Sequence, residues 1–260
     1  MKVNKDKDGV QVYINYTFYL GPIIAIIVGL LPLVFLKKIN YFLIGVAALA
    51  YFTAIGSKIV MELLFEPFFT TSSIQVYVAY GLLTLVFEIG YAYVFLLFIS
   101  KNNKLEMKDS VSYGAYLGFY ENFILLGVLA LLSLIVYALT PASALPQSMV
   151  SFYSGSYLPF ALPHLVDRLS SMIAHMFWGF MVFISVIKRT PKYFLYSMPM
   201  AFVDSIAAWW DFTHVVSYPI ISIVILSFTT AIACLMVYLS GASKFLNETK
   251  MEIKMVRNKT

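Results

Sequence analysis

Residues 75–99 read QVYVAYGLLTLVFEIGYAYVFLLFI, and Glu88 is the only charged side chain in this stretch. At about 1.5 Å of rise per residue, a helix of this length crosses the roughly 30 Å hydrocarbon core of a bilayer. The rest of the chain has the same character: 61% of its 260 residues are hydrophobic and 12% are charged. A soluble domain carries about 25% charged residues. The sequence therefore predicts an all-α, multi-pass membrane protein.

Seven apolar stretches are long enough to cross a membrane, which predicts a bundle of about seven transmembrane helices. They cover Tyr13–Leu36, Tyr41–Leu63, Gln75–Ile99, Val111–Leu139, Leu165–Ile187, Tyr193–Phe212 and Ser217–Ser240. We expect a single integral membrane domain over residues 1–243, with the motif-bearing helices between residues 75 and 212. A short charged tail over residues 244–260 follows it.

The basic residues indicate how the chain is oriented. Most of its 18 Lys and Arg side chains lie in alternate loops and in the C-terminal tail, whereas the intervening loops, such as residues 140–164, carry none. The positive-inside rule then places the N-terminus outside and the C-terminus in the cytoplasm. We expect a protein of the cell membrane. Because its basic residues sit in short loops between spans, we do not expect nucleic acid as a partner.

Four ionisable side chains share one predicted depth in the membrane. They are Glu88, Glu121, His175 and Asp204, in four consecutive spans. Counted from the predicted cytoplasmic end of each span, all four lie about 15–18 Å deep. Ionisable groups there cost about 2.5–3.5 kcal/mol each on insertion scales, so these four are the candidate catalytic residues. Such a group can activate water, bind a cation or relay protons, or it can merely hydrogen-bond internally and fix helix packing.

Two further polar residues are candidates for substrate binding. Arg168 precedes His175 by seven residues, which places both on the same face of the predicted helix. It either orients a substrate carbonyl or a carboxylate, or points outward as an interfacial arginine. Asn122 is a polar neighbour of Glu121.

Two other pairs bear on how the helices pack. Gly114 and Gly118 lie four residues apart, a spacing that predicts close approach of another helix. Lys58 and Glu62 are also four residues apart, near the outer end of the second span. We take them as a structural pair within one helix.

The order and spacing of four blocks within residues 75–211 resemble a known family. The blocks are FEIG (87–90), KDSVSYGAYLGFYEN (108–122), DRLSSMIAH (167–175) and MAFVD (200–204). They are similar to those of the YhfC-type intramembrane peptidases and, more widely, of the membrane proteases that process CAAX prenyl proteins and bacteriocins. The resemblance implies a cavity open to the cytoplasmic side, where a glutamate activates water. By position it matches the four candidate catalytic residues and Arg168 to the polar residues of the family motifs.

The chain departs from the family pattern at four positions, one of which is an arginine expected one turn after the glutamates, where nothing basic follows before Lys101. Ile89 stands where the pattern has a second glutamate, and Leu117 and Met200 stand where it has histidines. Two interpretations follow. In a glutamic-type intramembrane protease, Glu88 and Glu121 hold and deprotonate water, His175 transfers the proton and Asp204 orients His175. In a catalytically inactive homologue, the same cavity binds a membrane peptide or a lipid. A proton- or cation-coupled transporter is a third, less favoured class.

The expected partners are a membrane-embedded peptide or protein substrate and the lipid bilayer. We expect no cofactor, because a metal site with three His or Cys ligands cannot be built from one core histidine. A divalent metal bound by Glu88, Glu121 and His175 is the alternative left open.

Overall fold

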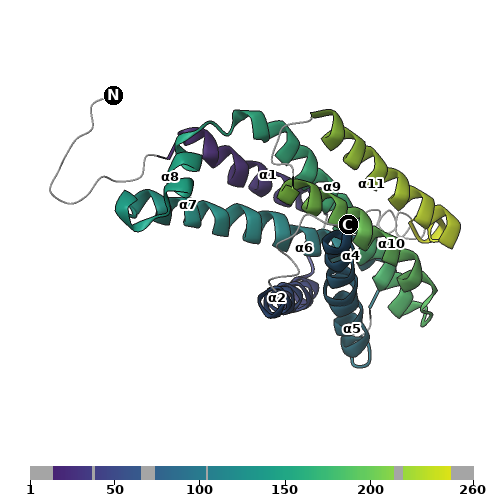
Figure 1. Ribbon diagram of the computed structural model, residues 1–260. Helices are drawn as coiled ribbons and strands as arrows, with labels where there is room; N and C mark the ends of the chain where they lie inside the picture. The colour runs from purple at the N-terminus through teal and green to yellow at the C-terminus, as the bar shows by residue number, and fades with distance from the viewer. Residues whose placement is uncertain (1–13, 37–38, 66–73, 104, 214–218, 247–260) are drawn as a thin grey trace.

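The computed structural model describes residues 14–36, 39–65, 74–103, 105–213 and 219–246, and the regular elements in these ranges are helices (Figure 1). The first half contains α1 (Leu20–Phe35), α2 (Tyr41–Leu64), α4 (Ile74–Leu83), α5 (Gly90–Ile99), α6 (Ser110–Phe119) and α7 (Ala130–Leu139). The second half contains α8 (Gln147–Ser154), α9 (Leu158–Ile187), α10 (Lys192–Thr213) and α11 (Pro219–Ser240). Short 3-10 turns are η1 (Tyr16–Tyr19), η3 (Met107–Asp109) and η5 (Ala142–Ala144). The predicted all-α fold is confirmed for these residues.

Two π-helical segments interrupt the long helices. η2 (Thr84–Ile89) joins α4 to α5, and η4 (Tyr120–Leu129) joins α6 to α7. Each join produces one continuous apolar helix, Gln75–Ile99 and Met107–Leu139. π-Helical turns have i→i+5 hydrogen bonds and occur frequently at functional sites, and Glu88 and Glu121 lie in these two segments.

Among the described residues, five helices are long and apolar enough to cross a membrane, and they correspond to five of the predicted spans. They are Tyr16–Phe35, Tyr41–Leu64, Gln75–Ile99, Met107–Leu139 and Leu158–Ile187. The sixth and seventh predicted stretches are helical as α10 and α11, and α11 contributes the shorter apolar helix Val224–Ser240. The total of seven spans and the orientation of the termini stay predictions. Most of the predicted tail, from residue 247, lies outside the described residues.

α9 is the central helix of the bundle. It packs against α1, α5, α6, α10 and α11, and Figure 1 shows α11 running alongside it. In its most apolar stretch 83% of the residues are buried, against 39% or less in the other four spans. A helix enclosed by protein on all sides can carry polar side chains that lipid would not tolerate.

α9 begins seven residues before the predicted start at Leu165. Its first turn contains Pro159, and the N–H groups of a first helical turn have no intrahelical acceptor, so proline is accommodated there. The longer helix changes the place of Arg168, which lies about 15 Å from the helix start rather than near its outer end.

Glycines let α6 and α9 approach closely. A Cβ added at Gly114 would lie 2.5 Å from the Met176 carbonyl oxygen, and one at Gly179 would lie 2.3 Å from the Gly114 Cα. A Cβ at Gly118 would lie 3.3 Å from the His175 Cβ. The predicted close approach at Gly114 and Gly118 is confirmed, and it places the end of α6 directly against His175.

Candidate functional site

Three of the four predicted catalytic side chains meet inside the bundle. One ligand atom each from Glu88, Glu121 and His175 lies within 4.8 Å of the other two. The three residues come from η2, η4 and the middle of α9. This agrees with the prediction that these three residues lie at one level of the bundle, and their depth in a membrane stays a prediction. Asp204 lies on α10, but its side chain is outside the described part of the structure, so its role stays a prediction.

The imidazole of His175 is oriented by its own helix. Its Nδ1 lies 2.9 Å from the Ser171 carbonyl oxygen, which can only accept a hydrogen bond, so Nδ1 carries the proton. In the neutral ring, Nε2 is then a lone-pair atom. It lies 2.9 Å from Glu121 Oε2 and 3.3 Å from Glu88 Oε2. His175 Nε2 and Glu88 Oε2 are both buried. Neither atom has a hydrogen bond of good geometry, in spite of the short distances around Nε2. Three electron-pair donors therefore face one another.

The second oxygen of each carboxylate is engaged by a cation. Oε1 of Glu121 accepts hydrogen bonds from Arg168 Nη1 at 3.0 Å and from Ser171 Oγ at 2.7 Å. Oε1 of Glu88 accepts one from Lys58 Nζ, which also donates to Thr84 Oγ1 at 2.9 Å. Each glutamate is thus fixed through Oε1 and presents Oε2 to His175.

Lys58 is a site residue that the sequence analysis did not identify. Its four-residue spacing from Glu62 predicts a pair within one helix, whereas the structure brings its ammonium to Glu88 in another helix. The available signal was its position within an apolar span, where an ionisable group needs a partner. Sequence spacing alone cannot identify a partner thirty residues away in another helix.

The two predicted substrate-binding residues have different surroundings. Arg168 points into the bundle, with its side chain 11% exposed, and its Nε also donates to Asp167 Oδ2 at 2.9 Å. The alternative of an outward-pointing arginine is therefore wrong for this structure. Asn122 is fully buried, and its amide nitrogen donates to the Gly118 carbonyl oxygen at 3.0 Å. Contact of either residue with substrate stays a prediction.

The donor set fits a divalent metal ion. Ligand atoms about 2.0–2.2 Å from a tetrahedral ion lie about 3.3–3.6 Å from one another. The separations of 2.9 and 3.3 Å around His175 Nε2 are close to this spacing. Two carboxylates and one imidazole suit Zn²⁺, Mn²⁺ or Fe²⁺. The structure therefore assembles the group that the sequence left open as an alternative, a metal site of Glu88, Glu121 and His175. The expectation of no cofactor is not confirmed.

These features define a multi-pass helical membrane protein with a buried Glu–Glu–His group that could hold a metal ion. Residues 24–226, more than three quarters of the chain, match the model of the YhfC intramembrane metalloprotease family, and the chain belongs to that family. The matched range includes all three residues of the group, and it confirms the resemblance found in the motifs. Comparisons with curated proteins and with solved structures gave no match.

Proposed function

We propose that the chain is an intramembrane metalloprotease that hydrolyses a peptide bond of a membrane-embedded peptide or protein. The observation that carries this proposal is the convergence of Glu88, Glu121 and His175 within 4.8 Å inside the bundle. Family membership supports the reaction class, because the family is one of intramembrane metalloproteases. We place the protein in the cell membrane.

Glu88 and Glu121 would hold the metal ion through Oε2, and His175 through Nε2. When bound, a divalent ion supplies Lewis acidity, which polarises a carbonyl oxygen and makes a water molecule more acidic. The Ser171 carbonyl oxygen fixes the tautomer of His175, a support that metal-binding histidines commonly have. Lys58 and Arg168 hold the far oxygens of the glutamates, so both carboxylates keep one orientation.

Glu121 is the proposed general base. Its side chain is 15% exposed, against 6% for Glu88 and 1% for His175, so Glu121 is the most accessible member of the group. Oε2 has two lone pairs, one for a metal ion and one for water, and it takes a proton from water as the water oxygen attacks the peptide carbonyl carbon. The proton then passes to the amide nitrogen as the C–N bond breaks, and a suitably placed carboxylate can perform both transfers.

Arg168 and Asn122 are the proposed substrate contacts. Arg168 lies beside Glu121, at the more exposed edge of the group. Among the described residues, Asn122 Oδ1 is buried without a hydrogen bond, so it has the capacity to accept one. We also propose that Asp204 assists His175, as the motif position implies.

A second candidate function is a non-catalytic homologue that binds a membrane peptide. Ile89, Leu117 and Met200 are at most 3% exposed, so these three departures from the family pattern are filled by buried apolar side chains. Lys58 and Arg168 also balance the charges of Glu88 and Glu121 without a metal.

Mass spectrometry of membrane-protein termini separates the two functions. The comparison is between cells that carry the wild type and cells that carry Glu121→Gln. A protease predicts one or more termini that vanish in the variant. Glu106→Gln is the matched control, because Glu106 pairs with Lys108 in a loop outside the group. If the termini are identical while both proteins are stably inserted, the chain is a binding protein.

A further inference from the structure

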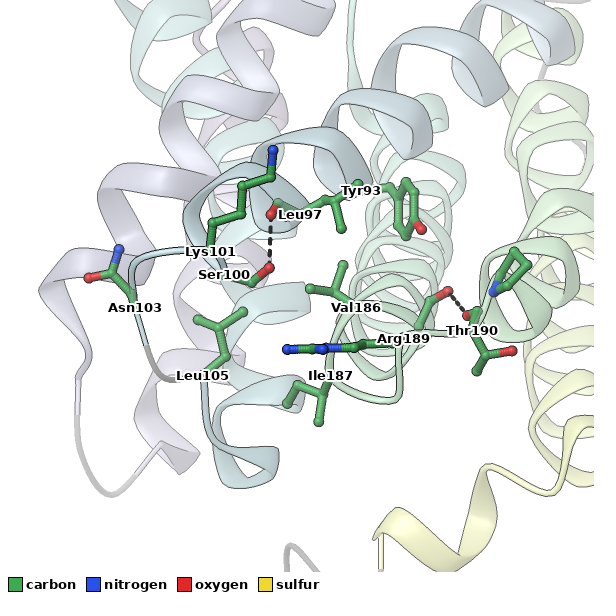
Figure 2. Close-up of a pocket in the computed structure, with 12 residues that line it drawn as sticks. Tyr93, Leu97, Ser100, Lys101, Asn103, Leu105, Val186, Ile187, Arg189 and Thr190 are labelled. Atoms are coloured by element: carbon green, nitrogen blue, oxygen red, sulfur yellow. Dashed lines mark hydrogen bonds between the residues drawn. The ribbon is translucent and has the colours of Figure 1, made fainter.

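A cavity of about 510 Å³ lies at one end of the bundle, away from the Glu–Glu–His group. It is enclosed by the end of α5, the loop that follows it, and the turn between α9 and α10 (Figure 2). Val186, in its wall, lies eleven residues after His175, which is about 16 Å along α9. We call this cavity the loop pocket.

Arg189 lines the loop pocket from a backbone conformation that arginine rarely adopts. Its φ is 50°, in the left-handed region that favours glycine. The N–H of Thr190 donates to the Ser185 carbonyl oxygen at 3.1 Å, and the N–H of Arg189 donates to that of Val186 at 3.2 Å. These two bonds form a Schellman motif at the end of α9, with Arg189 where glycine is the usual residue.

The end of α11 provides an internal comparison. The same two hydrogen bonds recur there, from Ala242 to Val237 and from Gly241 to Tyr238, and the left-handed residue is Gly241 with φ 72°. The backbone requirement is the same at both ends, so it does not explain the arginine. The side chain of Arg189 does: Figure 2 shows it extending into the loop pocket between Val186 and Ile187.

The loop pocket is cationic and its charges are not neutralised locally. Lys101 contributes a second cation from the loop after α5, and the lining residues include no acid. Within the described part of the chain, the side chains of Lys101 and Arg189 form no ion pair or hydrogen bond. The carboxylate nearest in sequence, Glu106, pairs with Lys108.

Half of the residues that line the loop pocket are apolar. Tyr93, Leu97, Val186 and Ile187 line it beside the polar Ser100 and Thr190. Leu97 is 42% exposed and lies two residues from the end of a helix long enough to cross the membrane. The pocket therefore opens at the level where a bilayer has its headgroups. Both of its loops are ones that we predict to be cytoplasmic, the side on which anionic lipids produce a negative surface potential.

We propose that the loop pocket binds a phosphate group, with the Arg189 guanidinium as its ligand and Lys101 as a second nearby cation. The guanidinium fork of arginine matches phosphate oxygens, and basic pockets between membrane helices bind lipid headgroups. The phosphate belongs either to an anionic phospholipid, whose glycerol and upper acyl carbons would lie against the apolar lining residues, or to a soluble phosphate ester. The site is independent of the proposed protease function.

The test measures ligand binding by the full chain purified in detergent. Two probes are phosphatidylglycerol and phosphatidylcholine in mixed micelles, detected by native mass spectrometry, and a third is glycerol phosphate in lipid-free detergent. We expect wild type to bind phosphatidylglycerol in preference to phosphatidylcholine. Arg189→Gly should weaken binding about tenfold or more, as expected for loss of a hydrogen bond to a charged group, and Lys101→Gln about fivefold, as expected for loss of one nearby cation. Glycine suits the backbone at position 189, so Arg189→Gly should fold at least as well as wild type.

Lys188→Gln is the matched control. It removes the same charge from the adjacent position, but the Lys188 ammonium lies over the Phe245 ring, 4.5 Å from its centroid, and not in the pocket wall. If wild type binds glycerol phosphate and Arg189→Gly does not, the phosphate comes from a soluble ester. If wild type binds only phosphatidylglycerol and Arg189→Gly loses that binding, the phosphate comes from a membrane lipid. Equal weakening in Lys188→Gln and Arg189→Gly would refute the pocket in favour of general surface charge, and unchanged binding in Arg189→Gly would refute it outright.

Discussion

Lys58 of α2 and Glu88 of η2 form an ion pair across thirty residues of sequence, and neither side chain is more than 15% exposed. The same ammonium donates to Thr84 Oγ1 at 2.9 Å, one helical turn before Glu88. Because the pair engages Oε1 of Glu88, it leaves Oε2 directed at His175. A cation supplied by a neighbouring helix therefore sets the orientation of a carboxylate in the candidate site.

The first prediction concerns the stability of this pair. Removal of one partner of a buried ion pair costs about 3–5 kcal/mol, because the remaining charge is uncompensated. We expect Lys58→Met to lower the free energy of unfolding by this amount in detergent. The double variant Lys58→Met/Glu88→Gln should recover much of the loss, since the buried charge is then gone. A single variant as stable as wild type would show that Lys58 does not support Glu88.

The second prediction is that the purified protein binds a divalent metal through Glu88, Glu121 and His175. Elemental analysis by mass spectrometry should find about one ion per chain in wild type, and far less in His175→Ala. Glu106→Gln, a carboxylate outside the group, should keep the full content. A chelator should lower the melting temperature of wild type, and added metal should restore it, because a ligand that binds only the folded state stabilises it. Equal metal content in wild type and His175→Ala would contradict the assignment.

The common level of the site residues could be predicted from sequence because helical rise is fixed. Residue counting put Glu88, Glu121 and His175 at one level, and the structure brings them together. Hydropathy also located five membrane-length helices. Their lengths and compositions depend on the bilayer and not on how the helices pack, so the sequence alone was sufficient.

What sequence reasoning missed depends on packing between helices. The π-helical segments at Glu88 and Glu121 leave no signature in the hydrophobic pattern. The partner of Lys58 depends on how α2 faces η2. Arg168 lies farther along its helix than predicted because α9 starts at Leu158, and its pair with Glu121 depends on how α9 faces η4. In each case the local pattern allowed several outcomes and tertiary contacts selected one.

The third prediction tests the contact between α6 and α9. A methyl group at Gly179 would lie 2.3 Å from the Gly114 Cα, a backbone atom that can move only with its helix. We expect Gly179→Ala to cost about 1–3 kcal/mol by overpacking and to weaken metal binding, because it separates Glu121 from His175. Gly45→Ala in α2 is the control: a Cβ there meets nothing within 4 Å, and alanine favours a helix by about 1 kcal/mol over glycine. Thermal melts of both variants decide the matter, and equal stability would refute the close contact.

The fourth prediction separates two adjacent serines that are equally buried. Ser171 Oγ donates to Glu121 Oε1 at 2.7 Å, whereas Ser170 Oγ donates to the Val166 carbonyl oxygen of its own helix at 2.9 Å. Residues that hydrogen-bond to metal ligands typically affect metal affinity or activity by about 10–100-fold. We expect Ser171→Ala to weaken metal affinity within this range, as measured by competition with a chelator, while Ser170→Ala leaves it unchanged. Because both variants remove one buried hydroxyl from neighbouring positions of α9, a loss of helix stability would affect them equally, and only a role at Glu121 predicts the difference.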